Sequence, residues 1–170
     1  MSPTDEHDEL LRHYLEKWGL LFEHLGATRM AGRVIGWLLT CDPPHQTAGE
    51  IAAVTGASPA SVSTATRAMT QAGMIERVGM PGQRSVFFRI APGMWARLMR
   101  IRLGRISAMS ELASEGLEIL PGARGRSGDR LREIHSYTQF MEQEMPALLT
   151  RWEQQWQREQ SKARGRKGGA

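Results

Sequence analysis

The stretch TAGEIAAVTGASPASVSTATRAMTQAGMI, residues 47–75, predicts a short helix, a tight turn, a second helix and the start of a strand. Thr47 and Glu50 form a capping box, in which each side chain satisfies a free backbone N–H at a helix start. Gly56 supplies the positive φ that such a turn needs. Ser58-Pro59 then opens the second helix, with Ser as N-cap and Pro at the first helical position. This order of elements predicts a helix-turn-helix.

The second predicted helix, which Gly73 ends, has two different faces. Val62 and Met69 are expected to pack it onto the first helix, whereas its other face is small or hydrogen-bonding with one long cation. A helix that enters a major groove needs small residues near the backbone, and hydroxyls or Arg to reach bases and phosphates. An ordinary surface helix explains the small polar residues but not the ordered caps and turn. We therefore predict that the DNA-contacting residues of this helix are Ser58, Ala60, Ser61, Ser63, Thr64 and Arg67.

The next segment predicts a β-hairpin. Residues 75–78 and 86–90 are rich in β-branched and aromatic residues, and Pro81-Gly82 between them is a turn signal. Two strands joined by a short turn after a helix-turn-helix make a wing. Gln83 and Arg84 fall near its tip, where an Arg commonly contacts the DNA backbone or enters a narrow minor groove. The alternative for Arg84 is a solvated hairpin arginine.

Four segments carry a resemblance to a known family: GATRMAGRVIG at 26–36, CDPP at 41–44, SVSTATR at 61–67 and PGQR at 81–84. With them the chain resembles the MarR-type winged-helix transcription regulators, and most of all the branch named after the glycine-betaine synthesis repressor. The resemblance implies a homodimeric repressor or activator. That branch has a basic residue and then Gly before the Ser-Val-Ser-Thr run, where this chain has Pro59-Ala60. The branch's preferred DNA sequence therefore does not carry over.

Charge is unevenly distributed along the 170 residues, whose net charge is +4. Residues 1–25 hold six acidic residues against two basic ones, whereas residues 26–110 hold ten arginines against three acidic residues. A positive excess on the segment that contains the helix-turn-helix is expected if it neutralises phosphates. Four of those arginines, Arg97, Arg100, Arg102 and Arg105, lie beyond the wing, where solvated or ion-paired arginines are the favoured interpretation over phosphate contacts.

The rest of the chain is predicted to be helical. A helix over residues 5–25 carries a broad apolar stripe, and a second over 28–41 has Thr28 as its cap. Ala91-Pro92 opens a long helix to about residue 120, and residues 121–128 form a loop. Pro146 is expected to kink a last helix over 129–157. Two apolar rows on the long helix indicate two covered faces, one covered by its own domain and the other by a second protomer. The rows are Met94, Leu98, Ile101, Met109 and Leu112, and Trp95, Met99, Leu103 and Ile106.

These elements predict a mainly α fold with a small β-wing: a winged helix-turn-helix with N- and C-terminal dimerisation helices. We divide the chain into an N-terminal dimerisation helix (1–27), a winged helix-turn-helix DNA-binding domain (28–92), long C-terminal dimerisation helices (93–157) and a basic disordered tail (158–170). The tail either adds non-specific DNA affinity or only aids solubility. A homodimer places two recognition helices in successive major grooves of double-stranded DNA, roughly 34–36 Å apart, on a near-palindromic operator.

Binding at a promoter most simply represses it by excluding polymerase. A small-molecule effector releases such a dimer from its operator if it binds more tightly to a dimer whose recognition helices are spaced wrongly for the DNA. Trp18, Trp37 and Trp95 are candidate effector-binding residues, with ordinary core packing as the favoured alternative. Cys41 is either a packed thiol, the favoured interpretation, or a redox sensor.

Several other function classes find no support in the sequence. We found no phosphate-binding glycine loop, no HExxH and no GxSxG motif, so we expect no enzyme and no cofactor. The histidines show no paired metal spacing, so no metal is expected. No signal peptide and no membrane-length apolar run are present, which predicts a cytoplasmic, nucleoid-associated protein without a membrane partner. Two alternatives remain: a winged-helix protein–protein interaction module that does not contact DNA, and a non-specific DNA-binding protein.

Overall fold

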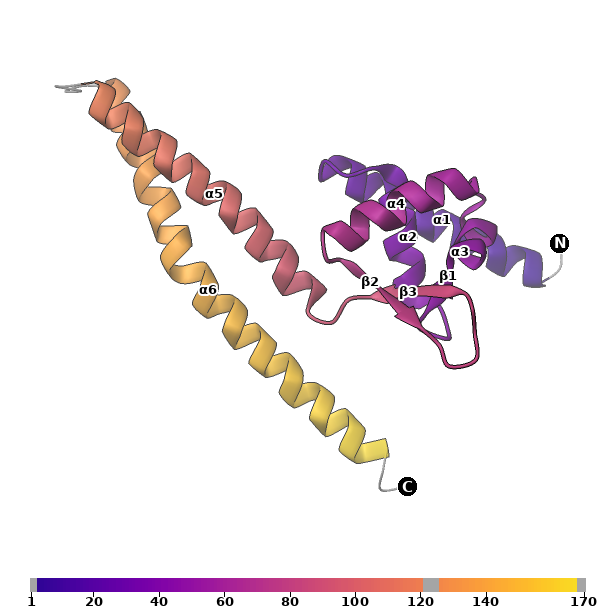
Figure 1. The fold of residues 1–170 in the computed structure, drawn as a ribbon. Coiled ribbons are helices and arrows are strands. Elements are labelled where there is room, and N and C mark those ends of the chain that lie inside the picture. Colours follow the sequence, from indigo (N-terminus) through magenta and orange to yellow (C-terminus); the bar gives the residue numbers. More distant parts are fainter. Residues whose placement is uncertain (1–2, 121–125, 168–170) are drawn as a thin grey trace. The chain divides into compact units, whose positions relative to one another are not determined.

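The computed structural model describes residues 3–120 and 126–167. They form two compact units, Met1–Met94 and Trp95–Ala170. The first unit holds four helices and a small sheet, and the second consists of two long helices (Figure 1). In chain order the elements are α1 (Pro3–His24), α2 (Arg29–Thr40), β1 (Gln46–Thr47), α3 (Ala48–Thr55), α4 (Pro59–Gln71), β2 (Ile75–Gly79), β3 (Val86–Ile90), α5 (Met94–Ile119) and α6 (Arg126–Lys167). The mainly α fold with a β-wing is therefore confirmed.

The core of the first unit lies where α2 meets α1, α3, α4 and the sheet. Thr28 caps α2 as predicted, since its hydroxyl accepts a hydrogen bond from the Ala31 N–H at 3.2 Å. Apolar side chains of every helix of this unit are excluded from water, which is the main force holding it together. The largest buried side chains here are Leu15, Ile35, Ile51, Ile75, Met94, Val34 and Val62.

The sheet is antiparallel with strand order β1-β3-β2. The two wing strands pair from Ile75↔Ile90 to Gly79↔Val86, as the sequence predicts. The short strand β1 was not predicted, because two residues show no alternation. Its Gln46 is buried and fully engaged: its amide oxygen accepts from the indole N–H of Trp37 at 3.3 Å, and its amide N–H₂ donates to the Pro43 carbonyl at 3.2 Å.

The second unit is an antiparallel pair of helices. Contacts run along its length: a Cβ on Gly116 would lie 3.2 Å from a Leu131 methyl carbon, and Ser110 Oγ lies 3.4 Å from His135 Nδ1. Further along, Arg100 donates to both carboxylate oxygens of Glu153 at 2.8 and 2.9 Å. Ser110 and Ala113 are buried, so small residues form part of the α5 face that meets α6.

Within one chain, the first apolar row of α5 is only partly covered. Large members of the first row, Ile101, Met109 and Leu112, are 42–68% exposed within one chain. Leu98, from the same row, is half-buried. Small side chains let two helices approach closely and leave long side chains to either side. The sequence pattern, which weighs large apolar residues, did not show this small-residue face, and the prediction that a second protomer covers one of the two rows stays a prediction.

Two predicted helix starts also differ. Helix α5 begins at Met94 and not at Ala91, because the Ala91 N–H bonds the Met74 carbonyl at 3.0 Å and Gly93 has a φ of 71°. Helix α6 begins at Arg126, so Ser127-Gly128 are helical; residues 121–125 of the predicted loop lie outside the described residues. Pro146 does not end α6, and the kink expected there stays a prediction.

Helix α6 continues to Lys167, so residues 158–167 of the predicted disordered tail are helical. Residues 168–170 of that tail lie outside the part of the chain that the structure describes. The added turns are rich in Gln, Glu, Ala, Arg and Lys, which are strong helix formers. Cations in the last turns of a helix also interact favourably with its negative C-terminal end. Composition had indicated a basic tail correctly, but not its conformation.

Candidate nucleic-acid interface

The orientation of α4 is set by hydrogen bonds at the starts of α3 and α4. At α3, the Thr47 N–H donates to Glu50 Oε2 at 2.6 Å and the Glu50 N–H donates to Thr47 Oγ1 at 3.2 Å. These bonds hold the pKa of Glu50 below its ordinary value, since they favour the charged carboxylate. Gly56 takes a φ of 63° in the turn, and Ser58 Oγ accepts from the Ser61 N–H at 3.3 Å. The predicted capping box, turn and N-cap are confirmed.

Helix α4 buries one face and exposes the other. Val62, Ala65, Thr66 and Met69 are between 0% and 7% exposed, so the predicted packing of Val62 and Met69 is confirmed. Thr66 satisfies its hydroxyl within the helix, donating to the Val62 carbonyl at 2.9 Å. The structure brings all six predicted contact residues onto the exposed part of α4 and its cap: Ser58, Ala60, Ser61, Ser63, Thr64 and Arg67. The helix therefore presents a small, hydroxyl-rich surface with one cation.

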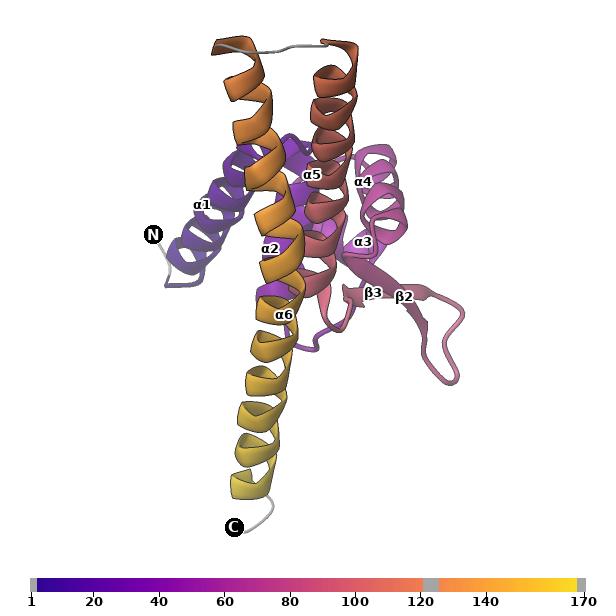
Figure 2. The ribbon, with the colours of Figure 1, turned by 90° about the vertical axis from the view of Figure 1, so that its left-hand side faces the viewer.

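The wing extends from the first unit beyond its helices (Figure 2). Its turn closes where the Gln83 N–H donates to the Met80 carbonyl at 3.0 Å, with Gly82 at a φ of 78°. Gln83 and Arg84 are both exposed in this turn, as the sequence predicts. A projecting hairpin with a cation at its tip has the shape and charge to contact a DNA backbone or minor groove.

Ion pairs reduce the positive charge that the sequence assigned to this region. Arg29 donates to Glu23 Oε2 at 2.7 Å, and Arg33 donates to Glu16 Oε2 at 2.7 Å. Acidic residues of α1 thus neutralise both arginines of α2. Four further arginines lie on α5, outside the winged helix, where Arg100 is paired with Glu153 as expected. The charge count over residues 26–110 therefore overstated the positive charge of the candidate surface.

In the winged helix, residues 28–92, the arginines without an ion pair lie on α4 and in the wing. Among the described residues, Arg67 and Arg84 form no ion pair. Arg77 on β2 is also exposed and unpaired, although sequence reasoning did not select it. The register of the wing strands, which sequence reasoning did not give, places it opposite Phe88 and leaves Glu76 opposite Arg89. The candidate surface thus has three free cations, from α4, β2 and the wing turn.

The three candidate effector-binding tryptophans lie in different places. Trp18 is half-buried between α1 and α2, where a Cβ on Gly36 would lie 2.8 Å from its ring. Trp37 is tied to Gln46 through its indole N–H, and Trp95, in the second unit, is 41% exposed. For Trp18 and Trp37 the structure provides packing roles. Effector binding by any of the three stays a prediction.

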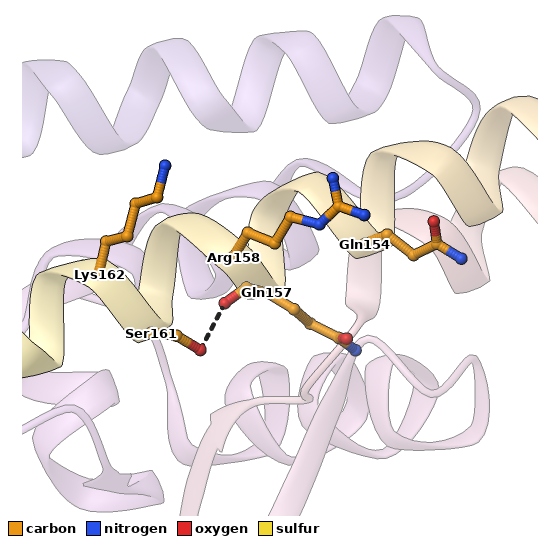
Figure 3. A pocket seen from close by; sticks show the side chains of 5 residues that line it. All are labelled: Gln154, Gln157, Arg158, Ser161 and Lys162. Atoms are coloured by element: carbon orange, nitrogen blue, oxygen red, sulfur yellow. Dashed lines mark hydrogen bonds between the residues drawn. The ribbon is translucent and has the colours of Figure 1, made fainter.

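An open hollow on α6 is lined by polar and charged side chains, and none of the three tryptophans lines it (Figure 3). In it the Ser161 hydroxyl donates to the Gln157 carbonyl at 2.9 Å, a bond within the helix. All of its lining residues are exposed, which gives the hollow the character of an exposed helix surface. The residues that line it are Gln154, Gln157, Arg158, Ser161 and Lys162.

Other functional groups are scarce in the part of the chain that the structure describes. Cys41 is buried, and this desolvation raises the pKa of its thiol, which favours the packed-thiol interpretation over a redox sensor. The described histidine, cysteine, aspartate and glutamate residues form no group of three that could hold a metal ion. None of the described helices is both long and apolar enough to cross a membrane.

Comparison with known proteins agrees with this geometry. A family model described as MmpR5-like MarR family transcriptional regulator matches residues 93–155. The HTH-type transcriptional regulator MmpR5 of Mycobacterium tuberculosis (strain ATCC 25618 / H37Rv) is 35% identical over 159 residues, which cover 91% of this chain and 96% of the relative. The chain belongs to the MarR family of winged-helix transcriptional regulators. These comparisons name the MmpR5-like regulators and not the glycine-betaine branch. Membership of the glycine-betaine branch therefore stays a prediction.

A solved structure described as a transcriptional regulator supports the MarR assignment at the level of fold. It has 36% sequence identity and a TM-score of 0.70, covering 85% of this chain and 98% of that one. MarR-family regulators bind DNA and act as dimers, and the family is one of transcription regulators, not of enzymes. The protein is therefore a DNA-binding transcriptional regulator.

Proposed function

We propose that the protein is a homodimeric, sequence-specific repressor whose α4 lies in the major groove and whose wing contacts the flanking backbone or minor groove. The observation that carries the proposal is the exposed face of α4. Ser61, Ser63 and Thr64 offer hydroxyls to base edges, Ala60 permits close approach, and Arg67 has no partner in the described protein. Such a face suits direct contact with bases and phosphates.

Exposed apolar side chains support dimerisation through residues 1–27 and 93–157. Helix α1 exposes Leu10, Tyr14 and Leu21, and Leu25 directly follows it; these four are 40–65% exposed. A second apolar stripe runs along α6 and includes aromatic side chains. Exposing a contiguous apolar surface to water is unfavourable and often marks an interaction site. Burying these two surfaces against a second copy is the simplest way to remove them from solvent. The exposed large residues of α6 are Ile134, Tyr137, Phe140, Leu148, Trp152 and Trp156.

Regulation follows from the same dimer. Two α4 helices related by a two-fold axis fit a near-palindromic operator, with half-sites separated by about one helical turn, roughly 34–36 Å. Occupying a promoter in this way excludes polymerase. An effector that prefers a dimer with another helix spacing releases the DNA, because a ligand shifts an equilibrium only through its differential affinity for the two states. We place the protein in the cytoplasm, at the nucleoid, where its DNA partner lies.

The test is binding to the DNA upstream of the protein's own coding sequence against a scrambled duplex of equal length, measured by fluorescence anisotropy. We expect a site preference of about 10³ or more, with most of it lost in Arg67→Ala. Equal, strongly salt-dependent binding to both duplexes would favour the non-specific alternative. Absence of binding to either duplex at low salt would leave the protein–protein interaction module as the better account.

A further inference from the structure

The wing carries one acidic residue and three arginines, and the register of its strands decides which arginine is neutralised. Glu76 is the single acidic residue between positions 75 and 90. It pairs across the strands with Arg89, whereas Arg77 pairs with Phe88. Because successive side chains of a strand point to opposite faces, Glu76 and Arg77 lie on opposite faces of the hairpin although they are adjacent in sequence.

The two strands therefore carry one arginine that forms an ion pair and one that does not. Arg89 Nε donates to Glu76 Oε1 at 2.6 Å, and the two side chains are 48% and 37% exposed. Arg77 is exposed as well, but within the described residues it has no ion-pair partner. Its guanidinium therefore keeps all its donors for an external ligand, and their planar arrangement matches a phosphate.

The location of Arg77 fits one such ligand. It lies on β2, an outer strand of the sheet, in the same hairpin as Arg84 and in the same compact unit as α4. A paired strand holds its side chain in a more fixed place than the wing turn holds Arg84. We propose that Arg77 binds a phosphate of the DNA backbone and that Arg89, whose charge Glu76 neutralises, does not. This inference rests on the proposed DNA-binding function and adds a contact to it.

The experiment compares two variants that change the net charge equally: Arg77→Gln and Arg89→Gln. Each full-length protein is titrated against a duplex of random sequence, of about 30 base pairs, by fluorescence anisotropy between 50 and 200 mM salt. Because a phosphate contact contributes about 0.9 to the slope of log K against log salt, losing Arg77 from both protomers lowers that slope by about two. At 50 mM salt the loss of affinity exceeds that at 200 mM by about tenfold. Arg89→Gln leaves the slope close to that of the unaltered protein.

Two further variants separate a phosphate contact from a structural effect. Arg77→Lys restores most of the slope, since the charge is kept, and the melting temperature of Arg77→Gln stays close to that of the unaltered protein. The paired change Glu76→Gln with Arg89→Gln removes the ion pair without changing net charge, and it leaves the slope unaltered. Equal slopes for Arg77→Gln and Arg89→Gln, with the unaltered protein still binding DNA, would overturn the Arg77 contact alone. No DNA binding by the unaltered protein would overturn this inference together with the proposed function.

Discussion

Gly32 on α2 lies directly against the main chain of Trp18 on α1. A Cβ at position 32 would stand 2.7 Å from the Trp18 carbonyl carbon and 2.8 Å from the Cα of Gly19, and closer still to the Trp18 carbonyl oxygen. Backbone atoms cannot move aside as a flexible side chain can. The crossing of α1 and α2 therefore depends on the missing side chain of Gly32, and this crossing ties the apolar stripe of α1 to the winged helix.

Replacing this glycine is expected to loosen the crossing. Gly32→Ala should destabilise the protein by about 1–3 kcal/mol, the usual cost of overpacking a tight core. Gly49→Ala is the matched control, because Gly49 is also helical and a Cβ there meets nothing nearer than Thr47 Oγ1 at 3.9 Å. The control should be neutral or stabilising by up to about 1 kcal/mol, since Ala favours helix more than Gly does. Chemical denaturation of both variants measures the difference, and equal stabilities would contradict the packing account.

Two serines of the α4 region should separate stability from DNA binding. Ser58→Ala removes the N-cap acceptor of the Ser61 N–H and should cost about 1 kcal/mol of stability. Ser63 is exposed, and only its backbone carbonyl takes part in a described bond, accepting from the Thr66 hydroxyl. Ser63→Ala should therefore leave the melting temperature unchanged and weaken binding to the preferred DNA. If Ser63→Ala melted earlier than Ser58→Ala, the assignment of these two roles would be wrong.

The capping box should make the stability of the protein fall toward acidic pH. The folded state holds the pKa of Glu50 below its ordinary value, mainly through the backbone N–H of Thr47. The stabilisation is therefore present above the unfolded pKa, about 4.3, and is lost as the pH falls through the folded value. The unaltered protein should melt higher than Glu50→Gln at neutral pH, and the gap should close on acidification below about pH 4. Calorimetry across this range tests the prediction, and a gap that widened toward acid would refute it.

If the apolar stripe of α6 forms part of the dimer interface, a charge placed in it should disrupt the dimer. Trp152 is 39% exposed within one chain, and introducing a charge there as Trp152→Glu should shift the protein toward monomer. Gln154→Glu adds the same charge two residues away on another side of the helix and should leave the dimer intact. Light scattering coupled to size-exclusion chromatography reports both masses. A Trp152→Glu variant that stayed dimeric would place the interface elsewhere.

Local rules predicted the helix-turn-helix of this fold well, because short-range chemistry determines it. Thr47 with Glu50, Gly56 and Ser58 each act on neighbouring backbone atoms, so their roles are visible in sequence. Longer-range features were missed for a physical reason. Three features depend on residues that are far apart in the chain. They are the pairing of β1 with β3, the burial of Ser110 against α6 and the neutralisation of Arg33 by Glu16. The free charge of Arg77 belongs to the same class, since it follows from strand register.

The central claim, that paired α4 helices recognise a DNA sequence, is tested most directly by selection from a library of random duplexes. We predict that the full-length protein enriches a two-fold-symmetric site whose half-sites are centred about 10–10.5 base pairs apart. Arg67→Ala should weaken the preference at defined positions of each half-site. A library that shows no enriched sequence, or an enriched sequence that Arg67→Ala selects equally well, would contradict it.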